Sequence, residues 1–199
     1  MPRPVSIDRR KALKQAQNLF WERGYSATPM SALLDATGMG AGSFYAAFNN
    51  KASLFELAIA DYAAFFDKQM DEYRTRLRGL DVVRAFLEQT LVCTSDRGRR
   101  KGCLLVNSAI ELDGVEPELH ELVVSYLREF HRGIRACVEQ AHQDGHLTGH
   151  MTVDDATAML VTHIQGLRVE SRLGLSRESA SQRLDSLFTA LTRREQEPL

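Results

Sequence analysis

Residues 30–51 of the chain read MSALLDATGMGAGSFYAAFNNK, two short apolar-periodic segments with a glycine-containing turn between them. Leu33 and Leu34 share one face of the first segment, and Phe44 and Phe48, four residues apart, share one face of the second. Gly38 suits the backbone conformation that a sharp turn between two helices needs. Two helices joined in this way form a helix-turn-helix, whose second helix enters the major groove of DNA. The stretch therefore predicts a DNA-binding head.

The segments on either side of this stretch are also helical in pattern. Residues 8–23 carry apolar side chains at helical spacing, and Gly24 is expected to end this first helix. Thr28 followed by Pro29 is typical of an N-cap and a first helical residue, so we expect Thr28 to cap the second helix. Asn50 is expected to cap a long fourth helix that joins the head to the rest of the chain.

Basic residues are concentrated near the N-terminus. The whole chain has a formal net charge of −1, yet residues 1–51 hold seven Lys or Arg against three Asp or Glu. A basic head on an acidic body directs only one end of the molecule towards phosphate groups. A solvated basic helix would be the alternative if the helix-turn-helix did not adjoin it.

The head resembles the signature of the tetracycline-repressor (TetR) family in Tyr25, Thr28, residues 38–48 (GMGAGSFYAAF), Lys51 and the pair Leu54-Phe55. The resemblance implies an all-α protein, and the helical patterns along the chain predict about nine helices. Residues 1–50 would form a three-helix DNA-binding domain with the helix-turn-helix, and residues 51–199 a helical ligand-binding and dimerisation domain. Members of this family are homodimeric bacterial transcription regulators, usually repressors that a ligand releases from DNA.

By position, the resemblance assigns the DNA contacts to the third helix and its flanks. The residues implied are Arg9, Arg10, Thr28, Ala41, Gly42, Ser43, Tyr45 and Lys51. Lys51 would bind phosphate at a helix N-terminus, where backbone amides also favour an anion. Tyr45 would reach a phosphate or a base edge, with packing on the fourth helix as its alternative role. Phe44 and Phe48 are expected to lie in the core.

The third helix departs from the family pattern at both ends. Gly40-Ala41 stands where the family usually has Ser-Lys, and Ala46 and Ala47 stand where histidines are usual. Few side chains on this helix can therefore hydrogen-bond to bases, although alanine methyl groups can contact thymine methyl groups. We expect Arg3, Arg9, Arg10 or the second helix to supply the missing polar contacts.

The same resemblance implies a ligand cavity lined by the fourth to the eighth helices. Its candidate residues are Phe65, Phe66, Phe86, Val106, Tyr126, Phe130 and His163. Almost all of them would serve equally well as core residues, and His163 lies on an apolar face that suits a hydrogen-bonded core histidine. No class of ligand follows from them.

Cys103 is the sharper candidate for a sensor. It follows the basic stretch 97–101 and stands at the expected start of a helix, and both features stabilise a thiolate. The Gly-Cys-Leu placement resembles that in some TetR-family sensors of electrophiles or oxidants. The alternative is a small buried hydrophobe. Cys93 and Cys137 lie in apolar stripes and are expected in the core, and the basic stretch is expected to be a solvated loop.

The last two helices would pair with those of a second copy, as they do in the family. The interface candidates are Leu184, Leu187, Phe188 and Leu191, with an intramolecular core role as the open alternative. Gly166 and small residues near it suit close helix packing. A two-fold protein of this kind reads two half-sites in DNA.

Few features of the sequence support any other class of protein. Hydrophobic residues make up 44% of the chain and charged residues 26%, which are ordinary globular values. No apolar run suits a membrane span or a signal peptide, so we expect a cytoplasmic protein. No catalytic residue set, phosphate loop or metal-ligand spacing can be placed, so neither an enzyme nor a cofactor is expected. The expected partners are double-stranded operator DNA, an unknown small-molecule inducer and a second copy, with a nonspecific architectural DNA-binding protein as the alternative.

Overall fold

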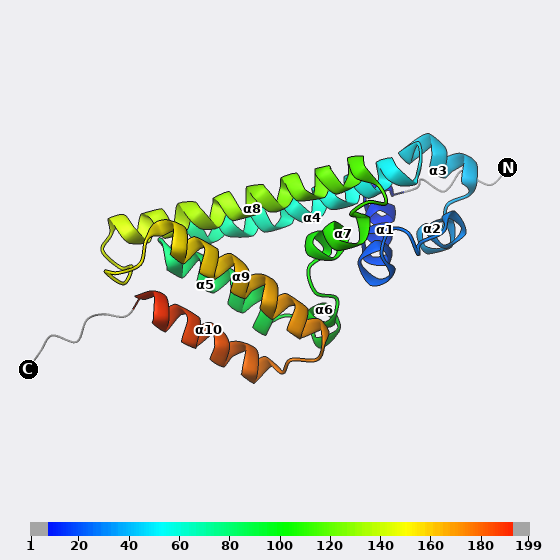
Figure 1. Cartoon of the computed structure of the whole chain (residues 1–199). Coiled ribbons are helices and arrows are strands. Elements are labelled where there is room, and N and C mark those ends of the chain that lie inside the picture. Colours follow the sequence, from blue (N-terminus) through cyan, green and yellow to red (C-terminus); the bar gives the residue numbers. More distant parts are fainter. Residues whose placement is uncertain (1–7, 193–199) are drawn as a thin grey trace, which may run out of the picture. The chain divides into compact units, whose positions relative to one another are not determined.

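The computed structural model describes residues 8–192, and the secondary structure of this part of the chain is entirely helical (Figure 1). The expected all-α class is therefore confirmed. The chain divides by its internal packing into two compact units. One comprises Met1–Ala64 and Leu104–Tyr126, and the other comprises Phe65–Cys103 and Leu127–Leu199. The division at residue 50 that the sequence suggested stays a prediction.

The first unit contains the expected three-helix head. The head consists of α1 (Arg9–Arg23), α2 (Met30–Thr37) and α3 (Ala41–Phe48). The first unit also contains α7 (Leu104–Leu112) and the first parts of α4 (Lys51–Arg74) and α8 (Pro117–Gln143). Gly38 has a left-handed φ of 65° between α2 and α3, as the turn requires. The Asn50 side chain accepts a 2.8 Å hydrogen bond from the Ser53 amide, so it caps α4 as predicted. The predicted helix-turn-helix is present.

Thr28 does not cap α2. The N-cap of α2 is Pro29, which offers no side-chain hydrogen bond. The Thr28 hydroxyl donates instead to the Gly24 carbonyl at 2.6 Å, and its side chain is fully buried. The hydroxyl therefore closes the loop between α1 and α2, and burial removes Thr28 from the residues that DNA can reach.

Aromatic packing fixes the head helices on α4. The Phe20 ring meets the Phe55 ring edge to face, with centroids 5.2 Å apart, and the Tyr25 ring lies 4.9 Å from the same Phe55 ring. The Gln17 side chain donates to the Ala58 carbonyl at 2.7 Å, which attaches α1 to α4 between the apolar contacts. Such aromatic pairs contribute about 0.5–1.5 kcal/mol each beyond the area that they bury.

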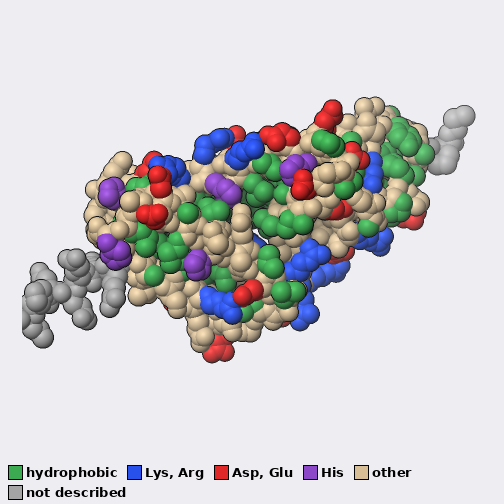
Figure 2. Space-filling model, viewed as in Figure 1, with side chains coloured by type: hydrophobic (Ala, Val, Ile, Leu, Met, Phe, Trp, Pro, Cys, Tyr) green, Lys and Arg blue, Asp and Glu red, His purple; other side chains and the backbone are tan. Residues whose placement is uncertain are grey.

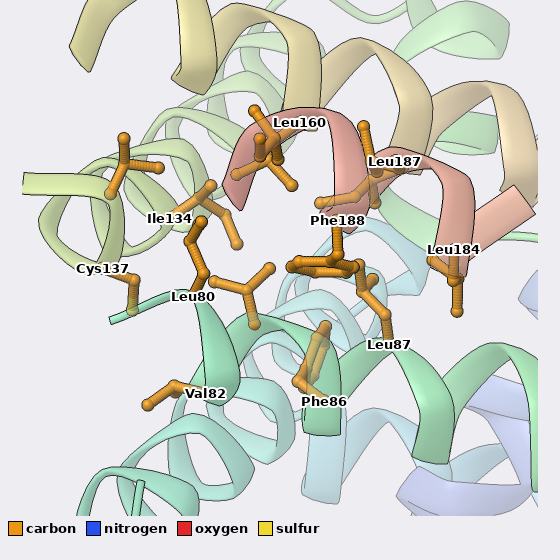
Figure 3. Packing of buried hydrophobic residues seen from close by; sticks show 14 of the residues in the cluster. Leu80, Val82, Phe86, Leu87, Ile134, Cys137, Leu160, Leu184, Leu187 and Phe188 are labelled. Carbon is orange, nitrogen blue, oxygen red and sulfur yellow. The ribbon is translucent and has the colours of Figure 1, made fainter. Parts of the chain in front are cut away.

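The second unit is built around a separate core. Its elements are α5 (Leu80–Leu87), a π-helical turn (Glu88–Val92), α6 (Asp96–Arg100), α9 (Val153–Arg172), α10 (Arg177–Thr192) and the remaining parts of α4 and α8. Side chains from α5, α8, α9 and α10 meet in this core, with Phe86, Leu87 and Phe188 near its centre (Figure 3). The basic stretch that was expected as a loop forms most of α6, because the Ser95 hydroxyl accepts the Gly98 amide and caps that short helix.

The same core contains the four residues that the sequence offered for dimerisation. No more than 3% of any of their side chains is exposed in the single chain: Leu184, Leu187, Phe188 and Leu191. Facing inward, they pack against α5, α8 and α9. The structure therefore gives them the intramolecular role that the sequence left open as the alternative.

Candidate nucleic-acid interface

Helix α3 separates its residues into a buried face and an exposed face. Phe44 and Phe48 are buried, with ring centroids 5.5 Å apart, as predicted. Ala41, Gly42 and Ser43 are exposed at the N-terminal end of the helix, and Tyr45 is 52% exposed. The backbone at this end can approach another surface closely, because its side chains are small. This is the shape that a major groove requires of a recognition helix.

Basic side chains flank α3 in the same unit. The Arg9 guanidinium carbon lies 5.5 Å from the centroid of the Phe48 ring, which places the start of α1 beside the end of α3. Arg10 is exposed one residue further along. Arg3 lies outside the described residues. Arg9 thus lies at one edge of α3, and Arg10 is the next residue of α1.

Lys51 occupies the first turn of α4 as predicted, but its side chain is half-buried. Its ammonium group lies 4.2 Å from the centroid of the Tyr25 ring, within the range of a cation–π contact. Burial lowers the pKa of Lys51, while the carboxylates of Glu111 and Glu116 act in the opposite direction. A phosphate at this site would therefore compete with the Tyr25 ring for the same cation.

Glu111 of α7 contacts the head, and the sequence did not single it out. Its Oε2 accepts the Tyr25 backbone amide at 3.0 Å and its Oε1 accepts the Ser26 amide at 2.7 Å. The loop between α1 and α2 is thus held by one carboxylate from 85 residues away. Gly24 permits this approach, because its φ is +87° and an added Cβ would lie 2.5 Å from Glu111 Oε2.

The candidates for the ligand cavity fall into both units. Phe66, Phe86 and Phe130 form a row of rings in the second unit, with successive centroids 5.4 and 5.8 Å apart. Phe65 is 48% exposed beside them. Val106 and Tyr126 are half-buried residues of the first unit. A cavity shared by these residues stays a prediction.

Two histidines of the second unit have environments that the sequence did not predict. His163 is exposed, with its Nδ1 2.8 Å from the Met159 carbonyl, so it is not a core histidine. His131, which the sequence did not bring forward, is half-buried beside Phe130, and its Nε2 lies 3.4 Å from Gln165 Nε2. Burial lowers the pKa of His131, which favours the neutral ring.

The three cysteines have three different environments. Cys103 is half-buried and immediately precedes α7, as the sequence predicted. Cys93 is exposed, so its expected core position is wrong: it follows the π-helical turn, which ends the apolar periodicity on which that position was based. Cys137 is buried as expected, and its Sγ lies 3.9 Å from the Arg74 guanidinium. Burial raises the pKa of the Cys137 thiol, and Arg74 opposes that shift.

None of the helices within residues 8–192 has the length and apolar character to span a membrane. Within the same residues there is no group of three or more His, Cys, Asp or Glu side chains that could hold a metal ion.

Comparison with known proteins places both parts of the chain. Residues 12–58 match the family model for bacterial regulatory proteins of the tetR family. Residues 79–187 match the model for the tetracyclin repressor-like C-terminal domain. The second match alone spans more than half of the chain, so the two together show the family.

Three similar proteins agree with this placement. The repressor ComR of Escherichia coli K12 is 27% identical over 193 residues, which cover 90% of this chain and 87% of ComR. The E. coli K12 repressor NemR is 27% identical over 139 residues, covering 69% and 68% of the two chains. A cysteine-substituted variant of the TetR-family regulator CifR, solved with 26-bp operator DNA, is 27% identical with a TM-score of 0.80, and the match covers 95% of this chain and 99% of CifR. With an exposed recognition helix in the matched head, the chain belongs to the tetR family of bacterial regulatory proteins and is a DNA-binding transcriptional regulator.

Proposed function

We propose that this regulator is a cytoplasmic, homodimeric repressor that binds a specific operator and is released from it by thiol chemistry at Cys103. The observation that carries operator binding is the division of α3, which exposes Ala41, Gly42, Ser43 and Tyr45 while it buries Phe44 and Phe48. Arg9 and Arg10 would contact phosphates, and Tyr45 would contact a phosphate or a base edge. The operator complex of CifR supports this use of the head.

The proposed signal acts through α7. Cys103 is bonded to Leu104, the first residue of α7, and Glu111 near the end of the same helix holds the loop between α1 and α2. A modification of Cys103 that displaces α7 would therefore disturb the loop that positions the head. The modification can release the protein from DNA only if it raises the free energy of the DNA-bound state more than that of the free state.

Thiolate oxidation provides one defined form of this chemistry. With hydrogen peroxide, the Cys103 thiolate attacks one peroxide oxygen, the S–O bond forms and the O–O bond breaks. A sulfenic acid remains on the cysteine, and hydroxide leaves and takes up a proton to become water. Two relatives have solved structures in a defined cysteine or redox state. The CifR structure is that of a cysteine-substituted variant, and the E. coli NemR structure is that of the reduced form.

The test is operator binding under oxidation. We expect the protein to bind the DNA upstream of its own gene more tightly than a scrambled fragment, at physiological salt, and to lose at least tenfold in affinity after hydrogen peroxide. Dithiothreitol should restore binding. Cys103→Ser should bind DNA normally and ignore the oxidant, while Cys93→Ser, which removes an exposed cysteine, should respond as the natural chain does. Fluorescence anisotropy measures the operator affinity of each of the three proteins with and without the oxidant.

Three other outcomes would each contradict a part of this proposal. If Cys103→Ser still responds to peroxide, Cys103 is not the sensor. If the natural chain prefers its operator but ignores peroxide, a small-molecule inducer replaces the thiol signal. Equal affinity for both fragments, persisting when operators are selected from random DNA, would favour the architectural DNA-binding protein.

The proposed dimer face is the groove between α9 and α10. The groove has a volume of about 470 Å³, and its lining includes Met159, Thr162, His163 and Gly166 of α9. A Cβ added at Gly166 would meet nothing within 4 Å in the single chain. Since family resemblance pairs these two helices with those of a second copy, the space at Gly166 suits a partner helix.

Replacing Gly166 with tryptophan should weaken the dimer at least tenfold and leave the folded chain intact. The indole would occupy the space assigned to the partner, whereas the chain itself has no atom within 4 Å of the new Cβ. Gly166→Ala is the matched control, which should keep the dimer and gain about 1 kcal/mol in helix stability. Sedimentation equilibrium measures the dimer constant and circular dichroism the fold. An unchanged dimer constant in the tryptophan variant would place the interface elsewhere.

A further inference from the structure

A second pocket lies in the unit formed by residues 65–103 and 127–199. It has a volume of about 250 Å³ and is enclosed by α6, the end of α9 and the start of α10. Its polar lining consists of Asp96, Arg99, Arg100, Ser171, Ser176 and Arg177. Figure 2 shows Lys and Arg side chains gathered over α6 on this face. This pocket has no part in the DNA interface or in the groove assigned to dimerisation.

The pocket contains an excess of positive charge. Three guanidinium groups face one carboxylate, Asp96, which is 3.5 Å from Arg99 Nη1 and accepts a 3.1 Å hydrogen bond from Arg177 Nε. Arg100 is exposed at the same edge. Because Asp96 offsets only one of the three cations, the lining keeps a formal charge of +2.

Arg99 is fixed in place. Only 6% of it is exposed, and its Nη2 donates to the Leu175 carbonyl in the turn between α9 and α10. This bond orients the guanidinium plane without neutralising it. A buried guanidinium whose charge faces a cavity is costly unless an anion compensates it.

Two buried polar atoms of the lining have no hydrogen-bond partner among the described residues, Arg99 Nε and Ser171 Oγ. Ser171 is 1% exposed and Arg99 is 6% exposed, so both residues are buried in the wall of the pocket. Buried polar groups are ordinarily paired, and one left unpaired beside a cavity indicates a missing partner. Arg99 Nε can only donate and the Ser171 hydroxyl can donate, so a single acceptor group in the pocket would satisfy both atoms.

We propose that this pocket binds the phosphate group of a small metabolite. A phosphate group carries about −1.5 to −2 charges and three strong acceptor oxygens, which match two net cations and several donors. Arginine pairs with such oxygens in a bidentate geometry, and the N-terminus of α10 adds a partial positive charge. The pocket volume of about 250 Å³ leaves room for a phosphate group with a small substituent.

Direct binding to the full-length protein tests the proposal. We expect titration calorimetry to show saturable binding of inorganic phosphate or phenyl phosphate at constant ionic strength, with acetate at least tenfold weaker. Arg100→Gln, Arg177→Gln and Ser171→Ala should each weaken phosphate binding, the arginine variants by about tenfold, which is the usual effect of one charge-assisted hydrogen bond. Arg172→Gln is the matched control, since it removes an exposed arginine from α9 outside the pocket.

Ser171→Ala also separates binding from folding. The Ser171 hydroxyl has no hydrogen-bond partner within residues 8–192, so its loss should leave the thermal midpoint unchanged and lower only phosphate affinity. Tighter binding of phenyl phosphate than of inorganic phosphate would identify an ester as the ligand, and the reverse would identify the free ion. Absence of saturable phosphate binding, equal affinity for acetate, or equal weakening by Arg172→Gln would overturn the proposal.

Discussion

Phe44→Ala should lower the free energy of unfolding of the protein by about 3–5 kcal/mol and abolish operator binding. The Phe44 ring is fully buried and lies 5.5 Å from that of Phe48, so truncation leaves a cavity beneath the recognition helix. A small domain has only ~5–15 kcal/mol to lose, and α3 has eight residues with which to hold its position. Urea denaturation and operator titration of the same preparation measure both effects.

Tyr45→Ala is the matched variant at the neighbouring position. Tyr45 is 52% exposed and its ring contacts Phe44 edge to face, so we expect a loss of no more than about 1.5 kcal/mol in stability. Operator affinity should fall by about tenfold, as it does when one specific contact is removed. Normal operator affinity in Tyr45→Ala would show that this ring does not touch DNA, and full activity in Phe44→Ala would contradict the buried position of that ring.

Removing the Glu111 carboxylate should have the second largest effect. Glu111→Ala breaks two hydrogen bonds from a charged acceptor to the Tyr25 and Ser26 amides, worth about 2–4 kcal/mol together when the exposure of Ser26 is allowed for. Because this loop sets α1 against α2, we expect operator affinity to fall at least tenfold. Glu111→Gln keeps one acceptor oxygen and should be intermediate. Thermal unfolding and operator titration provide the comparison.

Gly24 allows the same contact to be tested from the other side. Gly24→Ala places a Cβ 2.5 Å from Glu111 Oε2, and the backbone at φ 87° and ψ 169° lies in a region almost restricted to glycine, which strains alanine by about 1–3 kcal/mol. In the Glu111→Ala background the clash disappears and only the backbone strain remains, so the two substitutions should be non-additive. Equal costs of Gly24→Ala in both backgrounds would mean that the carboxylate does not bind this loop.

Short-range sequence patterns were sufficient to predict the helix-turn-helix of the head. The spacing of Phe44 and Phe48, the turn at Gly38 and the cap at Asn50 each depend on residues within four positions of one another, and the structure has all three. Local periodicity determines which face of a helix is apolar, because the helix repeat is the same in every protein. The helix-turn-helix and the exposed residues of α3 follow from this alone.

Periodicity does not determine which surface an apolar face will meet. Leu184, Leu187 and Phe188 have the pattern of a buried stripe, and that pattern fits a partner chain as well as it fits α5 and α8. Thr28 and Cys93 show the same limit on a smaller scale. The Thr28 hydroxyl donates to a loop carbonyl instead of capping α2. Cys93 was predicted in the core from an apolar stripe, but the π-helical turn before it ends that stripe and Cys93 is exposed.

The sequence by itself therefore determined the all-helical class, the recognition helix and its family. Only the tertiary structure brought Glu111 to the loop at Tyr25 and Ser26, and Arg99 to the turn between α9 and α10. These contacts join residues 76 to 86 positions apart, and they form only after the helices have packed. A single chain's sequence has no local signal for such pairs, because the free energy that selects them comes from packing between elements rather than from any one element.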